Sequence, residues 1–155
     1  MIASATSLIS AALALPAVAY LFSPFQSEAS SGWAEAGDIR SLPVDEPAEM
    51  VFRKKRTDGW KTIFEKSSVW VVKSSDGEVV AFAPHCTHLG CGYHWDEKNN
   101  NFLCPCHAST FAANGDVLTG PAPRPLDRFE TRIEGTRLWL GHVSRSPASS
   151  EKTST

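Results

Sequence analysis

Charged side chains are missing from the first 27 positions of this 155-residue chain, and the whole sequence carries a net charge of only −2. Without a strongly basic field, the composition argues against a nucleic-acid-binding protein. A phosphate-binding glycine loop and an internal repeat are also missing, which argues against a P-loop nucleotide site and a repeat solenoid. The length leaves room for one domain and a tail or anchor.

Cysteine is scarce, and its four copies fall in two short boxes that also contain histidine. Residues 86–91 read Cys-Thr-His-Leu-Gly-Cys, and residues 104–109 read Cys-Pro-Cys-His-Ala-Ser. Cys-x-His, a gap of 15 residues and Cys-x-x-His match the spacing of a Rieske [2Fe–2S] centre, in which two thiolates hold one iron and two imidazoles hold the other. Tetrahedral zinc, which uses the same residue types, and a plain disulfide domain with incidental histidines are the alternatives.

The boxes resemble those of the Rieske iron–sulfur protein of cytochrome bc and b6f complexes, closely over about residues 80–126. This resemblance implies an all-β fold: an antiparallel-sheet domain with an inserted cluster-binding subdomain at about 84–125. It also implies one [2Fe–2S] cluster, whose ligands by motif position are Cys86, His88, Cys104 and His107. It further implies a disulfide between Cys91 and Cys106 that pins the two ligand loops together, and it makes His107 the imidazole that hydrogen-bonds the quinol. His85, His94 and His142 match no ligand position, and we predict structural or surface roles for them.

The choice of ligands suits quinol chemistry. With neutral histidines, two ferric ions, two sulfides and two thiolates sum to zero charge, so an added electron meets less repulsion than in a four-thiolate centre. Each histidine binds iron through one ring nitrogen, and its other nitrogen can carry or release a proton. Such a centre can therefore accept an electron and a proton together, and quinol oxidation releases both.

Further residues are assigned by the same resemblance to the surroundings of the cluster. Leu89 and Gly90 are expected to form an apolar cap near the quinone, and Ser109 to donate its hydroxyl to a cluster sulfide. The proline loop, which would cover the cluster from a third side, is expected at Gly120, Pro121, Ala122 and Pro123. Because proline lacks an N–H and has a fixed φ, such a loop makes a stiff, dry wall; a generic proline-rich turn is the alternative.

Two positions depart from the family pattern. Phe111 stands where the family commonly has a tyrosine that donates to a ligand sulfur, here that of Cys86. Because hydrogen bonds to sulfur stabilise the reduced state, we expect a lower potential than in ubiquinol-using relatives, one better suited to menaquinol. Ala108 replaces a glycine, and it would be strained if this position requires a positive φ.

The rest of the chain divides into an anchor, a linker, the domain and a tail. Residues 1–25 are long enough for a transmembrane helix, although a cleaved signal peptide with a small-x-small site at 17–19 is the alternative. We predict a flexible linker at 26–35, the domain at 36–143 and a disordered tail at 144–155.

Within the domain the pattern predicts strands. One begins at 50–52 and runs into the basic run 53–56, which we interpret as a solvated turn and edge rather than a binding patch. A second lies at 60–64, and 69–72 and 79–82 flank an Asp-Gly hairpin turn. The insert should contain a short hairpin of 93–96 and 102–104 and a turn at 114–116, followed by closing strands at 129–133 and 137–140.

Three functions compete at this point. The first is the Rieske subunit of a bc-type quinol:cytochrome c oxidoreductase, inactive alone, with cytochrome b, a c-type cytochrome, quinol and the lipid bilayer as partners. Its head would lie on the outer side of an energy-conserving membrane, where an oxidising compartment preserves a disulfide. The second is the small Rieske subunit of an arsenite-oxidase-type molybdoenzyme, and the third is a soluble Rieske ferredoxin. The extra cysteine pair and the apolar N-terminus argue against the third.

Overall fold

The computed structural model describes residues 32–58 and 61–147, together with four helical and exposed residues near the N-terminus, Ala12, Ala14, Leu15 and Val18. Among these residues no helix is both long enough and apolar enough to cross a membrane. Most of the anchor predicted at 1–25 and of the linker predicted at 26–35 lies outside the described residues. Strand β1 begins at Ala34, so the last two linker positions belong to the sheet.

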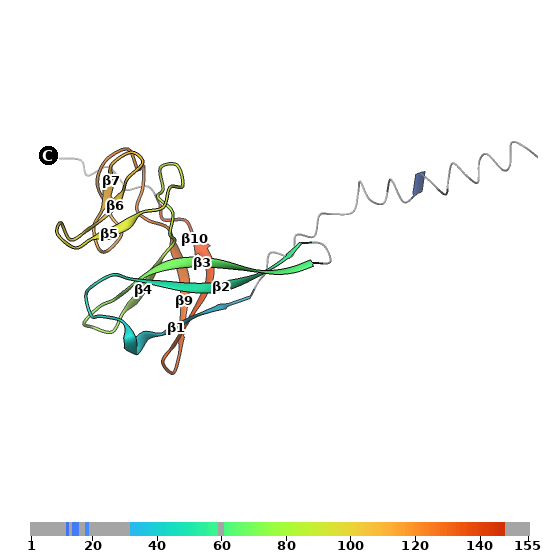
Figure 1. Ribbon diagram of the computed structural model, residues 1–155, viewed down its shortest axis with the longest axis horizontal. Coiled ribbons are helices and arrows are strands. Elements are labelled where there is room, and N and C mark those ends of the chain that lie inside the picture. The colour runs from blue at the N-terminus through green and yellow to red at the C-terminus, as the bar shows by residue number, and fades with distance from the viewer. Residues whose placement is uncertain (1–11, 13, 16–17, 19–31, 59–60, 148–155) are drawn as a thin grey trace, which may run out of the picture.

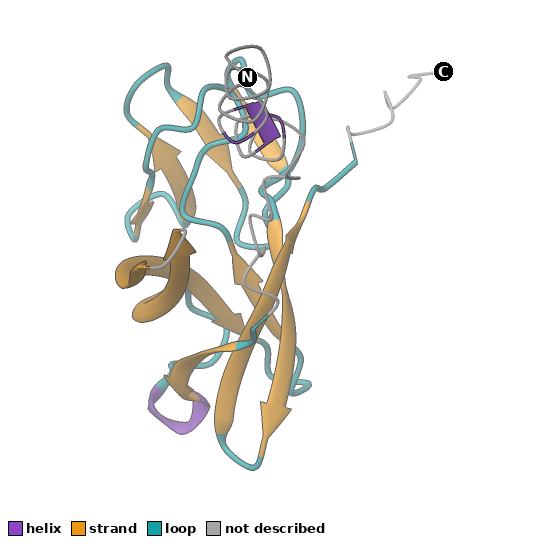
Figure 2. Ribbon diagram, turned by 90° about the vertical axis from the view of Figure 1, so that its right-hand side faces the viewer, coloured by secondary structure: helices purple, strands orange, loops and turns teal. Residues whose placement is uncertain are grey.

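Strands make up nearly all the regular structure of the described residues (Figure 2). The order is β1 (Ala34–Asp38), a 3-10 turn (Ile39–Ser41), β2 (Ala48–Asp58), β3 (Lys61–Lys73), β4 (Val79–Phe82), β5 (His94–Asp96), β6 (Asn101–Cys104), β7 (Ser109–Phe111), β8 (Val117–Thr119), β9 (Arg128–Glu134) and β10 (Arg137–Ser144). They form two antiparallel sheets, which confirms the all-β prediction.

The larger sheet has six strands in the order β1-β10-β9-β4-β3-β2, and its end strands β1 and β2 also contact each other, so the sheet nearly closes on itself. Its interior is a cluster of apolar side chains that includes Phe52, Val69, Val71, Leu138 and Leu140. The smaller sheet, β5-β6-β7-β8, lies at one end of the larger one (Figure 1). The first cysteine box lies in the connection from β4 to β5, between the two sheets, and the second lies between β6 and β7.

Strand β3 joins the two parts because successive side chains of a strand point to opposite faces. Val69 and Val71 pack into the interior of the larger sheet, whereas Trp70 packs into a second core shared with the smaller sheet. There the Trp70 ring meets Phe102 at a centroid distance of 5.5 Å, and Tyr93 meets Phe102 at 5.3 Å. The part of the domain that carries the cysteine boxes is therefore attached to the larger sheet through an aromatic core.

Several predicted elements are confirmed. β3 and β4 form the expected hairpin, with Gly77 at φ +90 in its turn. The β5–β6 hairpin, the turn at Gly115 and the closing pair β9–β10 also lie where the pattern places them.

Two predictions are wrong. β2 continues through the basic run 53–56 to Asp58 instead of turning there, because β3 starts at Lys61 and pairs with it along its full length. The strands predicted at 60–64 and 69–72 are thus one strand. The tail predicted as disordered from 144 is ordered up to residue 147, since Ser146 donates from its backbone N–H to Asp127 (3.0 Å) and from its hydroxyl to the Leu126 carbonyl (2.7 Å). Residues 148–155 lie outside the described residues.

Candidate metal centre

The first box forms a loop that closes on itself. The backbone N–H of Cys86 donates to the Cys91 carbonyl (2.7 Å), and the Gly90 N–H donates to the Cys86 carbonyl (2.9 Å). Gly90 has φ +76, a conformation that glycine adopts without steric cost. These bonds leave Leu89 projecting at the tip, 69% exposed, with Cys86 buried at the base.

The second box is a hairpin turn. Cys104 ends β6 and is directly paired with Ser109, the first residue of β7, so residues 105–108 make the turn between them. Ala108 has φ +54, which L-residues other than glycine adopt at a steric cost. The backbone at this position is therefore left-handed, and the alanine found here is strained. Ala108 and His107 are both exposed on the turn.

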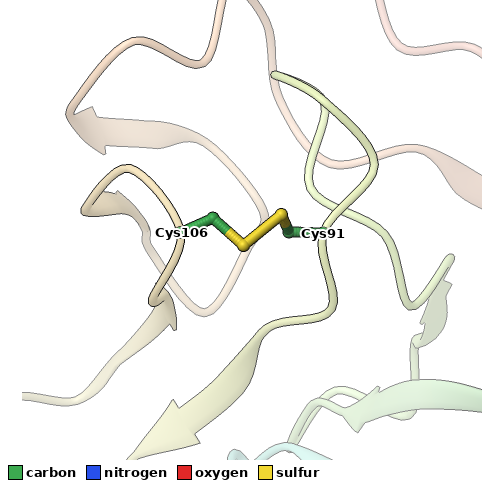
Figure 3. The surroundings of a disulfide bond; sticks show 2 residues. All are labelled: Cys91 and Cys106. Atoms are coloured by element: carbon green, nitrogen blue, oxygen red, sulfur yellow. A yellow bond between two sulfur atoms is a disulfide. The ribbon is translucent and has the colours of Figure 1, made fainter.

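A disulfide between Cys91 and Cys106 connects the two loops (Figure 3). Their Cα atoms are 6.6 Å apart, and the bridge closes a loop of 15 residues along the chain. The pairing expected from the resemblance is confirmed. Each loop contributes one sulfur, so the bridge fixes the distance between the two boxes.

The four predicted ligands form two pairs in these loops, Cys86 with Cys104 and His88 with His107. Cys86 and Cys104 are buried, free cysteines, while the rings of His88 and His107 lie perpendicular with centroids 4.8 Å apart. The Nδ1 atom of His88 is buried without a hydrogen-bond partner among the described residues. Since a buried polar atom without a partner is costly, this nitrogen is suited to a metal ion. Two thiols and two imidazoles are the donor set that a Rieske cluster needs.

Another grouping of sulfurs is close but not a ligand set. The sulfurs of Cys91, Cys104 and Cys106 lie within 4.8 Å of one another. Two of them are joined in the disulfide, however, and only a thiolate binds a metal well. Cys104 therefore belongs with Cys86, and its closeness to the bridge shows how near the disulfide lies to the centre.

The electrostatics of Cys86 keep its thiol protonated while no metal is bound. Burial raises the pKa of the Cys86 thiol, and the neighbouring Cys104 thiol raises it further, whereas the backbone of His88 and the Ser109 side chain lower it. The pocket by itself thus disfavours the thiolate at this position. A bound cation reverses this preference, because metal binding releases the thiol proton.

The segment predicted as the proline loop packs against the second box. The buried Ala122 donates its N–H to the Ser109 hydroxyl (3.2 Å), while Pro121 and Pro123 face solvent. Gly120 has φ +91, and a Cβ built on it would lie 2.5 Å from the Ser109 Cα. The loop backbone thus rests directly on the second box.

A hydrogen bond from Thr87, a residue to which we had assigned no role, attaches the first box to the same segment. Its hydroxyl donates to the Arg124 carbonyl at 2.6 Å. The two boxes and the segment 120–124 are therefore connected to one another. The disulfide joins the two boxes, this hydrogen bond joins the first box to the segment, and close backbone packing joins the segment to the second box. Ligand spacing gave no signal for Thr87, because its partner is 37 residues away.

Ser109 and Phe111 are both fully buried, on the strand that follows the second box. Tyr93 lies near, its ring centroid 6.2 Å from that of Phe111, but its hydroxyl donates to the Ala83 carbonyl (2.7 Å). Burial raises the pKa of Tyr93 well above its usual range. This phenol is thus engaged with the backbone and does not replace the hydroxyl that Phe111 lacks. His85, His94 and His142 are exposed.

Residues 33–130 match the family described as Rieske [2Fe-2S] domain. The chain belongs to the Rieske family. Its cofactor is accordingly a [2Fe–2S] cluster, which the paired thiols and imidazoles fit, and not tetrahedral zinc. The Rieske fold accounts for both sheets described above.

Similar proteins are the iron-sulfur subunits of a reductase and of a cytochrome b6-f complex. The menaquinol:cytochrome c reductase iron-sulfur subunit of Geobacillus thermodenitrificans is 33% identical over 138 residues, covering 86% of this chain and 81% of the relative. The cytochrome b6-f complex iron-sulfur subunit of Synechococcus sp. (strain JA-3-3Ab) is 31% identical, covering 91% and 84%.

Among solved structures, the plasma membrane Rieske protein of Synechocystis PCC 6803 is similar, with a TM-score of 0.50 and 31% identity, over 70% of this chain and 98% of that one. A quaternary ammonium Rieske monooxygenase, with a TM-score of 0.52 but 14% identity, shares the fold alone, over 75% of this chain and 35% of that one.

Proposed function

We propose that this chain is the electron-transfer subunit of a membrane quinol:cytochrome c oxidoreductase of the bc type. It takes one electron and one proton from quinol and passes the electron to a c-type cytochrome, with cytochrome b as its other partner, and it has no activity alone. The observation that carries this proposal is the perpendicular pair of imidazoles, 4.8 Å apart, together with two buried free thiols in the same loops. The relatives that cover most of the chain are subunits of such complexes.

The chain's residues divide the work. Cys86 and Cys104 would hold the inner iron and His88 and His107 the outer one, and the bound cluster supplies a one-electron acceptor. Because His88 Nδ1 is the buried atom, Nε2 is the nitrogen of this residue that remains to hold a proton. His107 lies exposed on its turn, so its outward nitrogen can accept a hydrogen bond from quinol. Leu89 and Gly90 would exclude water beside that contact.

Menaquinol is the quinone that we propose. It is a stronger reductant than ubiquinol, so a centre of lower potential can still oxidise it. Phe111 offers no hydroxyl to a ligand sulfur, and the nearby Tyr93 hydroxyl is bound to the Ala83 carbonyl. Removing a hydrogen bond to sulfur lowers the potential. The menaquinol specificity of the Geobacillus relative agrees with this reading.

We place the domain on the outer side of an energy-conserving membrane, anchored by residues 1–25 and free to move on the part of the predicted linker that precedes β1, residues 26–33. The disulfide supports an oxidising compartment. In this arrangement the head carries its electron from the quinol site to a haem. Replacing several linker residues with proline should slow turnover and leave the cluster spectrum intact.

Co-purification from membranes, with haem analysis and a menaquinol-oxidation assay, tests the proposal. We expect b- and c-type haem in the preparation, and His107→Ala should abolish oxidation in the complex while the exposed His142→Ala leaves it unchanged. Recovery of a molybdopterin subunit without haem b would instead favour the arsenite-oxidase-type subunit. Wild-type activity in a His107→Ala complex with an intact cluster would contradict the role given to this residue.

A further inference from the structure

The hairpin of β2 and β3 extends far beyond the rest of its sheet (Figure 1). β3 pairs with β4 only between Trp70 and Lys73, whereas its pairing with β2 continues to the match of Lys61 with Asp58. The outer ribbon, residues 53–58 and 61–66, therefore has neither edge paired with another described strand. A two-stranded ribbon of this kind gains little stability by itself. The stability of the domain therefore does not explain the sequence of the outer ribbon, and a contact outside the domain is the alternative.

The two faces of the outer ribbon differ in charge. On one face the register of the hairpin sets Lys54 opposite Glu65 and Lys61 opposite Asp58, so that each cation faces an anion. Arg56 lies opposite Ile63 on this face. On the other face Arg53 lies opposite Lys66 and Lys55 lies opposite Phe64. We call this second set, Arg53, Lys55, Phe64 and Lys66, the cationic face.

Among the residues that the structure describes, no anion forms an ion pair with the cationic face. Like charges directly opposite on neighbouring strands are destabilising, which is the arrangement of Arg53 and Lys66. Both residues and Lys55 are exposed, and none of the three takes part in an ion pair among the residues that the structure describes. An external anionic partner would remove this repulsion.

The apolar residues of the same face indicate the kind of anionic partner. Phe64 is 68% exposed, and Val51, which precedes it on this face of the hairpin, is 64% exposed. Cations around exposed apolar side chains suit the headgroup region of an anionic bilayer, where the charges meet phosphates and the apolar groups enter the acyl boundary. A soluble anion would neutralise the cations but would leave the Phe64 ring exposed to water.

The position of the ribbon agrees with a bilayer as the occupant. β1 begins on the same side of the domain as the projecting ribbon, and it follows an N-terminal segment without a charged residue before Glu28 (Figure 1). We propose that the cationic face rests on an anionic lipid surface in one of the positions that the moving head adopts. This inference rests on the membrane location proposed above.

Lysine acetylation of the full-length, cluster-loaded protein in vesicles tests the inference. The rate at Lys66 is compared between phosphatidylcholine vesicles and vesicles that also contain phosphatidylglycerol. We expect slower acetylation of Lys66 only in the anionic vesicles, reversed by high salt because salt screens such contacts. Lys98, exposed in the β5–β6 turn, should react equally in both.

Matched variants sharpen the test. Lys55→Gln and Lys98→Gln change the net charge equally, but only the first removes a cation from the cationic face. Lys55→Gln should weaken the protection of Lys66 about fivefold, the factor that about 1 kcal/mol per cation near an anionic surface corresponds to, and Lys98→Gln should leave it unchanged.

Equal rates at Lys66 in the two kinds of vesicle would overturn the inference. So would protection that requires the cytochrome b subunit, since the ribbon would then be a protein interface. Quinol oxidation is not measured, so failure here is distinct from failure of the proposed function.

Discussion

Ala108 provides a sharp test of the site, because it adopts φ +54 in the turn that carries His107. The left-handed conformation costs an L-residue about 1–2 kcal/mol relative to glycine. Glycine in turn loses about 0.4–1 kcal/mol more on folding, because its unfolded chain has more freedom. Ala108 is exposed, so removing its methyl group sacrifices little burial. Ala108→Gly should therefore stabilise the domain by about 0.5–1 kcal/mol, or about 2–5 °C in Tm.

Gly135 offers the reciprocal control. It has φ +62 in the β9–β10 turn, and a Cβ placed on it meets no atom within 4 Å. Gly135→Ala should lower the free energy of unfolding by about the amount that Ala108→Gly raises it. The double variant should be about as stable as the wild type, because the effects of independent sites on stability add. Urea unfolding of the oxidised, cluster-loaded protein, followed by tryptophan fluorescence, measures all four stabilities. If Gly135→Ala is destabilising while Ala108→Gly is neutral, the strain assigned to Ala108 is refuted.

Other perturbations address the cluster, the cysteine boxes and the tail. Phe111→Tyr should raise the midpoint potential in a protein-film titration, and an unchanged potential would contradict the menaquinol argument. Thr87→Val should release cluster iron faster and cost about 1–3 kcal/mol, because the Arg124 carbonyl loses its donor, whereas Thr87→Ser should behave as wild type. Reducing the disulfide, which closes a 15-residue loop, should cost about 3 kcal/mol in urea unfolding. Burial alone would raise the pKa of the Asp127 carboxyl, but Arg124 and the Ser146 N–H lower it below the usual 3.8. The carboxylate therefore stabilises the fold above pH 3.8, and this contribution is lost as the pH falls through the lowered pKa. Asp127→Asn should thus be less stable than the wild type at neutral pH and approach its stability in strong acid, as measured by urea unfolding.

The cysteine and histidine positions were predictable from the sequence because their chemistry demands fixed offsets along a short stretch of chain. Hairpins with Gly77 or Gly115 in their turns were predictable for a similar reason, since each signal is local. Thr87 was not, because its partner carbonyl is brought close only by the fold. The basic run was misinterpreted because four successive charges resemble a turn. Pairing with β3 overrides that local preference, and the exposed edges of the ribbon tolerate the charges.

The sequence alone left the backbone conformation at position 108 open, and the structure shows a positive φ there. A glycine in relatives and an alanine here cannot by themselves reveal φ. The turn between two directly paired residues, Cys104 and Ser109, imposes the left-handed value. The alanine therefore indicates a strained position and not a different backbone path.

Strand β3 has a mechanical consequence for electron transfer. Its alternate side chains belong to the interior of the larger sheet and to the core beneath the boxes, so neither core can shift without disturbing the other. The backbone bond from the Ala83 N–H to the Asp127 carbonyl (2.8 Å) fastens the start and end of the insert together. The two cores are thereby coupled, so a long-range movement that transfers the electron is expected to be a rotation or translation of the whole domain.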